Sequence, residues 1–141
     1  MKSILVPVDG SASSLNAVKV AIKLQREYGA GTLYVINVQA PIISGNVTRF
    51  ISSETINDFY QEEGEKMLTE ARALLKDAGV VTEVSIQVGA AAKVIAEFAK
   101  KHECTAIIMG TRGLGGVSGL ILGSVATKVL HLVDIPVTLV K

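Results

Sequence analysis

The residues best suited to chemistry lie in the stretch MGTRGLGGVSGLILGS, residues 109–124, which holds six glycines and follows an apolar run. Glycine adopts positive φ easily and lets another molecule approach the main chain. Exposed N–H groups that lead into a helix N-terminus attract anions, and the helix dipole adds to this attraction. Arg112 is the loop's single cation, and Ser124 is suited both to act as N-cap and to donate its hydroxyl to a phosphate. The pattern therefore favours a triphosphate site.

The spacing of these glycines argues against two common phosphate motifs. A Walker A loop needs glycine, four residues and then Gly-Lys-Ser/Thr, and no glycine in this stretch has Gly-Lys at that offset. The dinucleotide fingerprint begins at Gly113 and Gly115, but Ser118 occupies its third glycine position, and the stretch follows a late strand. What does fit is Gly110, two residues, Gly113, nine residues, and then Gly123 with Ser124.

The elements that must position this loop alternate between strand and helix. Short β-branched runs predict strands, and apolar residues three and four positions apart predict helices. Strands are predicted over residues 3–9, 32–38, 80–88, 104–109 and 136–140, and helices after residue 11, over 51–78, around 95–99 and after the glycine-rich loop. In the long second helix, Gly64 is an expected bend, and Phe59, Met67 and Leu74 are expected to pack in the core.

Alternating strands and helices indicate an α/β fold with a mainly parallel sheet and right-handed crossovers. Ligands of such sheets bind at the carboxyl ends of the strands, where the strand order reverses. The first predicted strand ends in Asp9-Gly10-Ser11 and the fourth ends in Gly110. If these strands are neighbours, one crevice collects both loops.

Composition narrows the class of protein. A chain of 141 residues fits one domain, residues 1–141, and a net charge of +1 gives no electrostatic case for nucleic acid. No apolar run is long enough for a membrane span, and Cys104 cannot form an intramolecular disulfide, so we expect a cytoplasmic protein. Cys104 opens a buried strand and is interpreted as a core residue. His102 and His131 lack partners at metal-ligand spacing and are interpreted as structural.

The whole chain resembles the universal stress protein family, and in particular its ATP-binding branch, whose motif is G-2x-G-9x-G-(S/T). The resemblance rests on that motif and on the segments ILVPVDGS, QVGAAAKVIAEFA, IIMGTRG, LILGSVATKVL and IPVTLVK. It implies an open five-stranded parallel sheet of order 3-2-1-4-5 with helices on both faces, Rossmann-like and of the adenine nucleotide α-hydrolase type. That order makes the first and fourth strands neighbours.

The resemblance also implies a set of nucleotide contacts. The nucleoside is expected to contact Pro7, Val8 and Asp9, with the adenine near Val38. Gly89 is expected to close the far side of the pocket. Met109 and Gly110 are expected beside the adenosine and ribose. The phosphates are expected against Arg112, Gly113, Gly123, Ser124 and Val125, with Mg²⁺ held through the phosphates.

Two positions depart from the family pattern. Thr105 and Ala106 stand where the family usually has an aspartate, and the nine-residue spacer contains no Lys or Arg. The lower positive charge predicts either a weaker affinity for a triphosphate or a larger contribution of Mg²⁺ to balancing the phosphate charge. For Asp9 two roles stay open: a ligand to a ribose hydroxyl or Mg²⁺, or a cap of the first helix.

The functional expectation is an ATP-binding regulatory protein that acts as a homodimer through its last strand and contacts other proteins. One alternative is an enzyme, either a slow ATP hydrolase or an ATP-pyrophosphatase-like transferase. The transferase chemistry requires a Ser-Gly-Gly-type phosphate loop after the first strand, and the segment VDGSASS does not contain one. In addition, no general base is evident in the loops. A second alternative is a family member that has lost nucleotide binding and acts only by associating with other proteins. The intact glycine spacing argues against this alternative.

Overall fold

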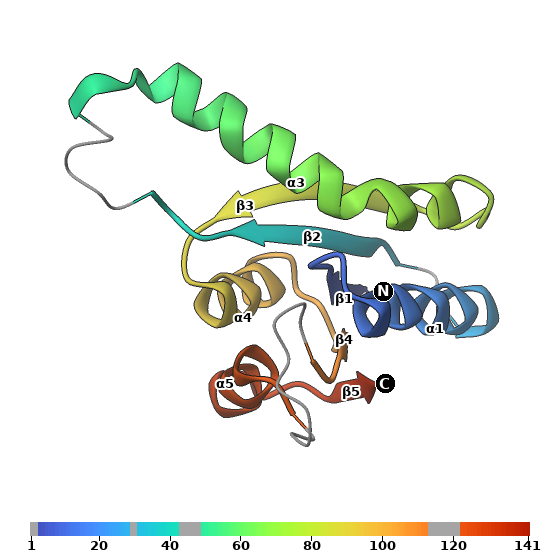
Figure 1. Ribbon diagram of the computed structural model, residues 1–141. Helices are drawn as coiled ribbons and strands as arrows, with labels where there is room; N and C mark the ends of the chain where they lie inside the picture. Colours follow the sequence, from blue (N-terminus) through green and yellow to red (C-terminus); the bar gives the residue numbers. More distant parts are fainter. Residues whose placement is uncertain (1–2, 29–30, 43–48, 113–121) are drawn as a thin grey trace.

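The computed structural model describes residues 3–28, 31–42, 49–112 and 122–141, and Gly113 of the expected site lies outside these ranges. Strands and helices alternate along the chain, as shown in Figure 1. The elements are β1 (Ile4–Pro7), α1 (Ala12–Tyr28), β2 (Leu33–Gln39), α3 (Ser53–Lys76), β3 (Thr82–Val88), α4 (Ala91–Lys101), β4 (Ala106–Gly110), α5 (Ser124–Leu132) and β5 (Val137–Val140).

The five strands form one parallel sheet in the order β3-β2-β1-β4-β5, which confirms the predicted order. In the centre, Ile4 pairs with Ala106 and Leu5 pairs with Ile107. The strand order reverses between β1 and β4, so their carboxyl ends lie side by side. This is the point at which parallel α/β sheets bind ligands.

Helices cover both faces of the sheet, and each face has its own apolar core. Alternate residues of the central strands point to opposite faces. Val6 and Ile108 join the core under α1 and α3, whereas Leu5 and Ile107 join the core under α4 and α5. These four side chains are at most 1% exposed, as the continuously apolar β1 and β4 segments predict for strands buried on both faces.

The long helix differs from its prediction in three ways. It spans Ser53–Lys76, two residues shorter at each end, and begins after Ser52, whose side chain accepts a hydrogen bond from the Thr55 N–H. Gly64 does not interrupt it. A Cβ atom at Gly64 would lie 2.7 Å from Ile86 side-chain carbons, so glycine lets α3 pack closely on β3. The expected core residue Phe59 is 48% exposed, because the first turns of α3 project beyond the sheet in Figure 1.

Candidate functional site

The exit from β1 is a tight turn built from its own polar side chains. Asp9 Oδ1 accepts a hydrogen bond from the Ser11 N–H at 2.9 Å, and Gly10 has φ +84°, a conformation that favours glycine. Ser11 Oγ accepts from the Ser14 N–H at 3.2 Å, so Ser11 is the residue that caps α1. Asp9 therefore braces the turn before the helix, and within the described part of the chain its second carboxylate oxygen accepts no hydrogen bond.

A buried amide, which was not among the predicted site residues, holds the ends of β1 and β2 together. Asn37 is 1% exposed, and its Nδ2 donates to the Val8 carbonyl at 2.8 Å. Its Oδ1 accepts from Gln39 Nε2 at 2.7 Å, and Met67 Sδ lies 3.3 Å from its Nδ2. The sequence signal that could have identified Asn37 is its position as a polar residue within the apolar strand LYVINVQ. A polar side chain buried at such a position needs hydrogen-bond partners.

The expected adenine side is apolar and tightly packed. Val38 packs against the same apolar core as Met109 and Val125, which brings three predicted contacts to the α4/α5 face of the sheet. Gly89 has φ +152° and its N–H donates to the Gln39 carbonyl at 2.9 Å. A Cβ atom at Gly89 would lie 2.7 Å from Val94 Cγ2. Glycine is thus required here by the fold itself.

Gly110, at the end of β4, also meets protein rather than open space. A Cβ atom there would lie 2.8 Å from both the Ser13 carbonyl carbon and the Ser14 nitrogen, and would contact Ser13 Oγ. Ser13 Oγ in turn donates to the Arg112 carbonyl at 2.6 Å. The first turn of α1 therefore fixes the start of the glycine-rich segment, and Ser13 is a second residue that was not predicted from the sequence.

The two ends of the glycine-rich segment are joined by backbone hydrogen bonds. The Gly123 N–H donates to the Thr111 carbonyl at 2.6 Å, and the Thr111 N–H donates to the Val140 carbonyl at 2.9 Å. This pairing places Arg112 and Ser124, both exposed, at one end of the sheet. It also commits the Gly123 N–H to the protein, although Gly123 was expected against a phosphate.

The start of α5 corrects one detail of the prediction. Gly123 is the N-cap, with φ −74° and ψ 165°, and Ser124 is the first residue of the helix. No side chain of the described residues caps the first turn, so its N–H groups lack the usual internal acceptor. Ser124 therefore presents its hydroxyl beside uncapped N–H groups, which together form a donor set suited to a phosphate.

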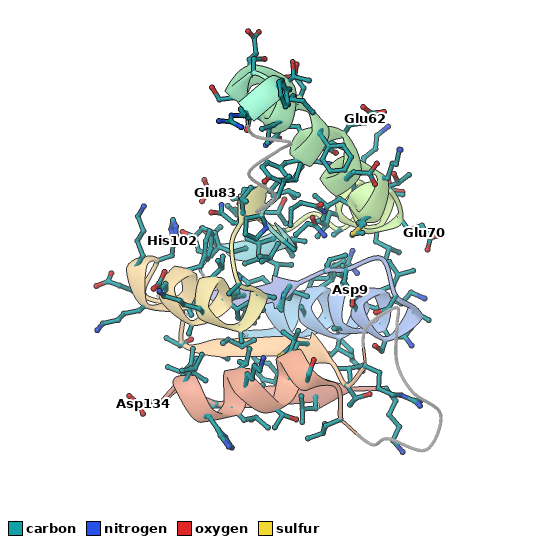
Figure 2. All side chains as sticks on the ribbon, turned by 60° about the vertical axis from the view of Figure 1, so that its left-hand side comes forward. Asp9, Glu62, Glu70, Glu83, His102 and Asp134 are labelled. Atoms are coloured by element: carbon teal, nitrogen blue, oxygen red, sulfur yellow. The ribbon has the colours of Figure 1, made fainter. Side chains whose placement is uncertain are left out.

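The titratable side chains of the described residues do not gather into a metal-binding cluster. Figure 2 shows His102 and Asp134 on the side of the molecule away from Asp9. Among the residues that the structure describes, no three His, Cys, Asp or Glu side chains converge to hold a metal ion. Burial raises the pKa of the Cys104 thiol to about 11, so this thiol is protonated at neutral pH and is a poor nucleophile.

Two clefts lie between helices in the described part of the chain. One, of about 330 Å³, separates the start of α1 from α3 and is lined by Val8, Gly10, Ser11, Ser14, Leu15, Lys66, Met67, Thr69 and Glu70. The other, of about 340 Å³, separates α4 from α5 and is lined by Ala90, Ala91, Ala92, Lys93, Val125, Lys128, His131 and Leu132. Each includes one predicted nucleotide contact, Val8 in the first and Val125 in the second.

A sequence model of the universal stress protein family matches residues 1–141. The chain belongs to the universal stress protein family. Universal stress protein MJ0531 of Methanocaldococcus jannaschii is similar at 35% identity over 99% of this chain and 82% of its own. The fold is similarly shared: the hypothetical protein MJ0577, solved for a structure-based assignment of its biochemical function, superposes with a TM-score of 0.83 at 28% identity, over 99% of this chain and 95% of that one.

A further solved relative carries a bound nucleotide. It is a universal stress protein in complex with cAMP, 27% identical, with a TM-score of 0.74, over 99% of this chain and 97% of that one. The five-stranded Rossmann-like sheet predicted for the family is thereby confirmed as its fold in this chain. Within the described ranges, no helix is long and apolar enough to cross a membrane.

Proposed function

We propose that this universal stress protein binds ATP at the carboxyl edge of its sheet and works as a nucleotide-dependent regulator. The observation that carries the proposal is the hydrogen bond from the Gly123 N–H to the Thr111 carbonyl. It closes the base of the glycine-rich segment and holds Arg112 and Ser124 at the end of β4, next to the end of β1. A guanidinium, a hydroxyl and uncapped helix N–H groups then share one edge of the sheet.

The adenosine end of the proposed site is apolar. We assign the base to the side lined by Val38, with Met109 behind it, because both belong to the core on the α4/α5 face. Gly89 follows β3 on the same side, whereas Val8, at the exit from β1, faces the core under α1 and α3 and is proposed to meet the nucleoside from the opposite side. The relative in complex with cAMP supports an adenine ligand, since it shares both the fold and 27% of the sequence.

The residues present fit Mg²⁺ as a partner of the phosphates rather than as a metal held by the protein. Asp9 has one carboxylate oxygen committed to the Ser11 N–H, which leaves the other for a ribose hydroxyl or for the ion. A bound Mg²⁺ would neutralise phosphate charge that Arg112 alone does not balance. Affinity for ATP is therefore expected to depend strongly on Mg²⁺.

Calorimetric titration tests the proposal directly. We expect ATP with Mg²⁺ to bind in the micromolar range, which corresponds to about −8 kcal/mol. GTP should bind more weakly, because the backbone at Val38 is expected to read the adenine base. Gly113→Val should abolish most of the affinity by filling phosphate space. If ATP does not bind, or if Gly113→Val binds like the wild type, the loop is not the site.

The first turn of α5 offers a matched pair of variants. Ser124→Ala removes a hydroxyl assigned to a phosphate, and a hydrogen bond to a charged group contributes about 1.5–3 kcal/mol, so affinity should fall at least tenfold. Thr127→Ala removes a hydroxyl that donates to the Gly123 carbonyl, at 3.0 Å, within the helix. Its ATP affinity should stay within about twofold of the wild type; equal losses in both variants would remove Ser124 from the phosphate contacts.

We also propose that two chains associate through β5. This strand lies at the edge of the sheet and carries the mainly apolar sequence VTLV. An exposed edge of this kind invites pairing with another chain, and antiparallel pairing of two identical edges forms a closed dimer. Because β5 also accepts the Thr111 N–H through Val140, such a dimer would set two nucleotide sites close to the joint.

A further inference from the structure

The cleft between α4 and α5 has an apolar floor and a basic rim. Its floor consists of Ala91, Ala92, Val125 and Leu132, and its volume is about 340 Å³. The two helices lie side by side over one face of the sheet, as Figures 1 and 2 both show. Leu132 is 55% exposed, which leaves a large apolar side chain at the end of the groove.

Every titratable side chain that lines this groove, among the residues that the structure describes, is a base: Lys93 from α4, and Lys128 and His131 from α5. Lys93 lies 4.0 Å from Glu97, but both side chains are largely exposed, and such a pair contributes little. In the described part of the chain, no ion pair involves Lys128 or His131. The rim is therefore positive, and no carboxylate of these lining residues balances it.

We propose that this groove docks an acidic amphipathic segment of a partner protein. An apolar side chain of the segment would enter between Val125 and Leu132, and carboxylates on either side would meet Lys93 and Lys128. A groove between two helices suits the helix-in-groove mode, in which apolar anchors occupy the floor and charges set the orientation. Complementary charges at a rim chiefly raise the association rate and the specificity.

Charge also argues against a second copy of this chain as the occupant. In a two-fold pair of identical grooves, the lysines of one copy would face those of the other, and like charges in such contacts are unfavourable. The small apolar floor likewise disfavours a free inorganic anion, which would leave the floor exposed to water. An acidic segment satisfies both features of the groove at once.

This inference goes beyond nucleotide binding and does not depend on it. The two sites share α5, and Val125 of the groove floor is also one of the expected phosphate contacts. Variants on the groove rim nevertheless leave the assigned phosphate contacts in place. ATP affinity measured on the same variants therefore separates a failure of this inference from a failure of the proposed function.

The test is a selection of displayed random peptides, each about two to four helical turns long, on the purified protein. Recovered peptides are expected to be acidic and to carry leucine-like residues at helical spacing. One recovered peptide is then synthesised and its affinity measured by fluorescence anisotropy for the wild type and for a double variant, Lys93→Glu with Lys128→Glu. The affinity should fall at least tenfold in this variant. A control with the same net charge, Lys23→Glu with Lys100→Glu, replaces exposed lysines outside the groove and should stay within twofold.

A second pair of variants tests the apolar floor. Leu132→Ser should weaken the peptide about tenfold, whereas Leu130→Ser, which changes an equally large and 41% exposed side chain of α5 outside the groove, should not. Selection of no peptide, or of basic peptides, would overturn the inference. Equal affinity for the groove and control variants would overturn it as well. Peptides that resemble the acidic α3 segment of this chain would instead identify a second copy as the occupant and overturn the choice of a partner protein.

Discussion

Replacing Gly110 by alanine separates two reasons for a glycine at the end of β4. The sequence motif assigns Gly110 to close approach of the nucleotide, whereas the structure places α1 against it. A new Cβ atom would lie 2.8 Å from two backbone atoms, the Ser13 carbonyl carbon and the Ser14 nitrogen. Backbone atoms cannot move aside by changing rotamer, so the whole first turn of α1 must shift.

The cost of this shift can be bounded. Overpacking of a close-packed site destabilises a protein by about 1–3 kcal/mol. For a domain of this size, each kcal/mol lowers the melting temperature by roughly 3–5 °C, so Gly110→Ala should melt about 3–15 °C below the wild type. The shift also disturbs the Ser13 Oγ hydrogen bond to the Arg112 carbonyl, so ATP affinity should fall together with stability.

Thermal unfolding followed by circular dichroism, with ATP calorimetry well below the transition, measures both effects. Gly79→Ala is the control: Gly79 has φ +69°, and a Cβ atom added there would meet no atom within 4 Å, so its cost of about 1–2 kcal/mol arises from the backbone conformation alone. That variant should lose stability but keep ATP affinity. A wild-type melting temperature in Gly110→Ala would refute the packing argument, and if ATP binding were also lost, the glycine would serve the ligand.

Three other measurements follow from the structure. ATP turnover by the isolated protein should be far below the typical enzyme value of about 10 s⁻¹, because Asp9 braces the turn after β1 and His102 lies on the far side of the molecule from it; a turnover near that value would identify an enzyme. Val137→Lys should convert dimers into monomers by light scattering, whereas Val81→Lys beside the opposite edge strand should not. The stability of the protein should decline between pH 9 and 11, because the folded Cys104 thiol, with its pKa raised to about 11, keeps a proton that the unfolded thiol releases; Cys104→Ala should lack this part of the decline.

Much of the fold was predictable because its signals are local. The short β-branched runs of β1 and β4 indicated strands, and the structure pairs them at the centre of the sheet. The exposure of Phe59 was less predictable. Phe59 follows the helical spacing of core residues, but it lies where α3 extends beyond the sheet. Periodicity reports which face a residue occupies, and it does not report how far the neighbouring layer extends.

The roles of individual glycines could not be inferred from their spacing. Gly64, Gly89 and Gly110 each exclude a side chain that would collide with another part of the fold: Ile86 for Gly64, Val94 for Gly89, and the first turn of α1 for Gly110. A sequence pattern records only that a side chain is absent. Whether the vacated space belongs to a ligand or to another part of the protein depends on tertiary packing.

This distinction changes how the glycine motif of the family applies to this chain. The first turn of α1 packs against Gly110, and the Gly123 N–H donates to the Thr111 carbonyl. Both ends of the motif therefore have structural roles within the protein. They fix the positions at which Arg112 and Ser124 leave the sheet. The groups assigned to phosphate contact are then the exposed guanidinium, the Ser124 hydroxyl and the N–H groups in the first turn of α5, which no described side chain caps. Conservative changes at Arg112 and Ser124 should therefore reduce nucleotide affinity without loss of stability, whereas changes at Gly110 should reduce both.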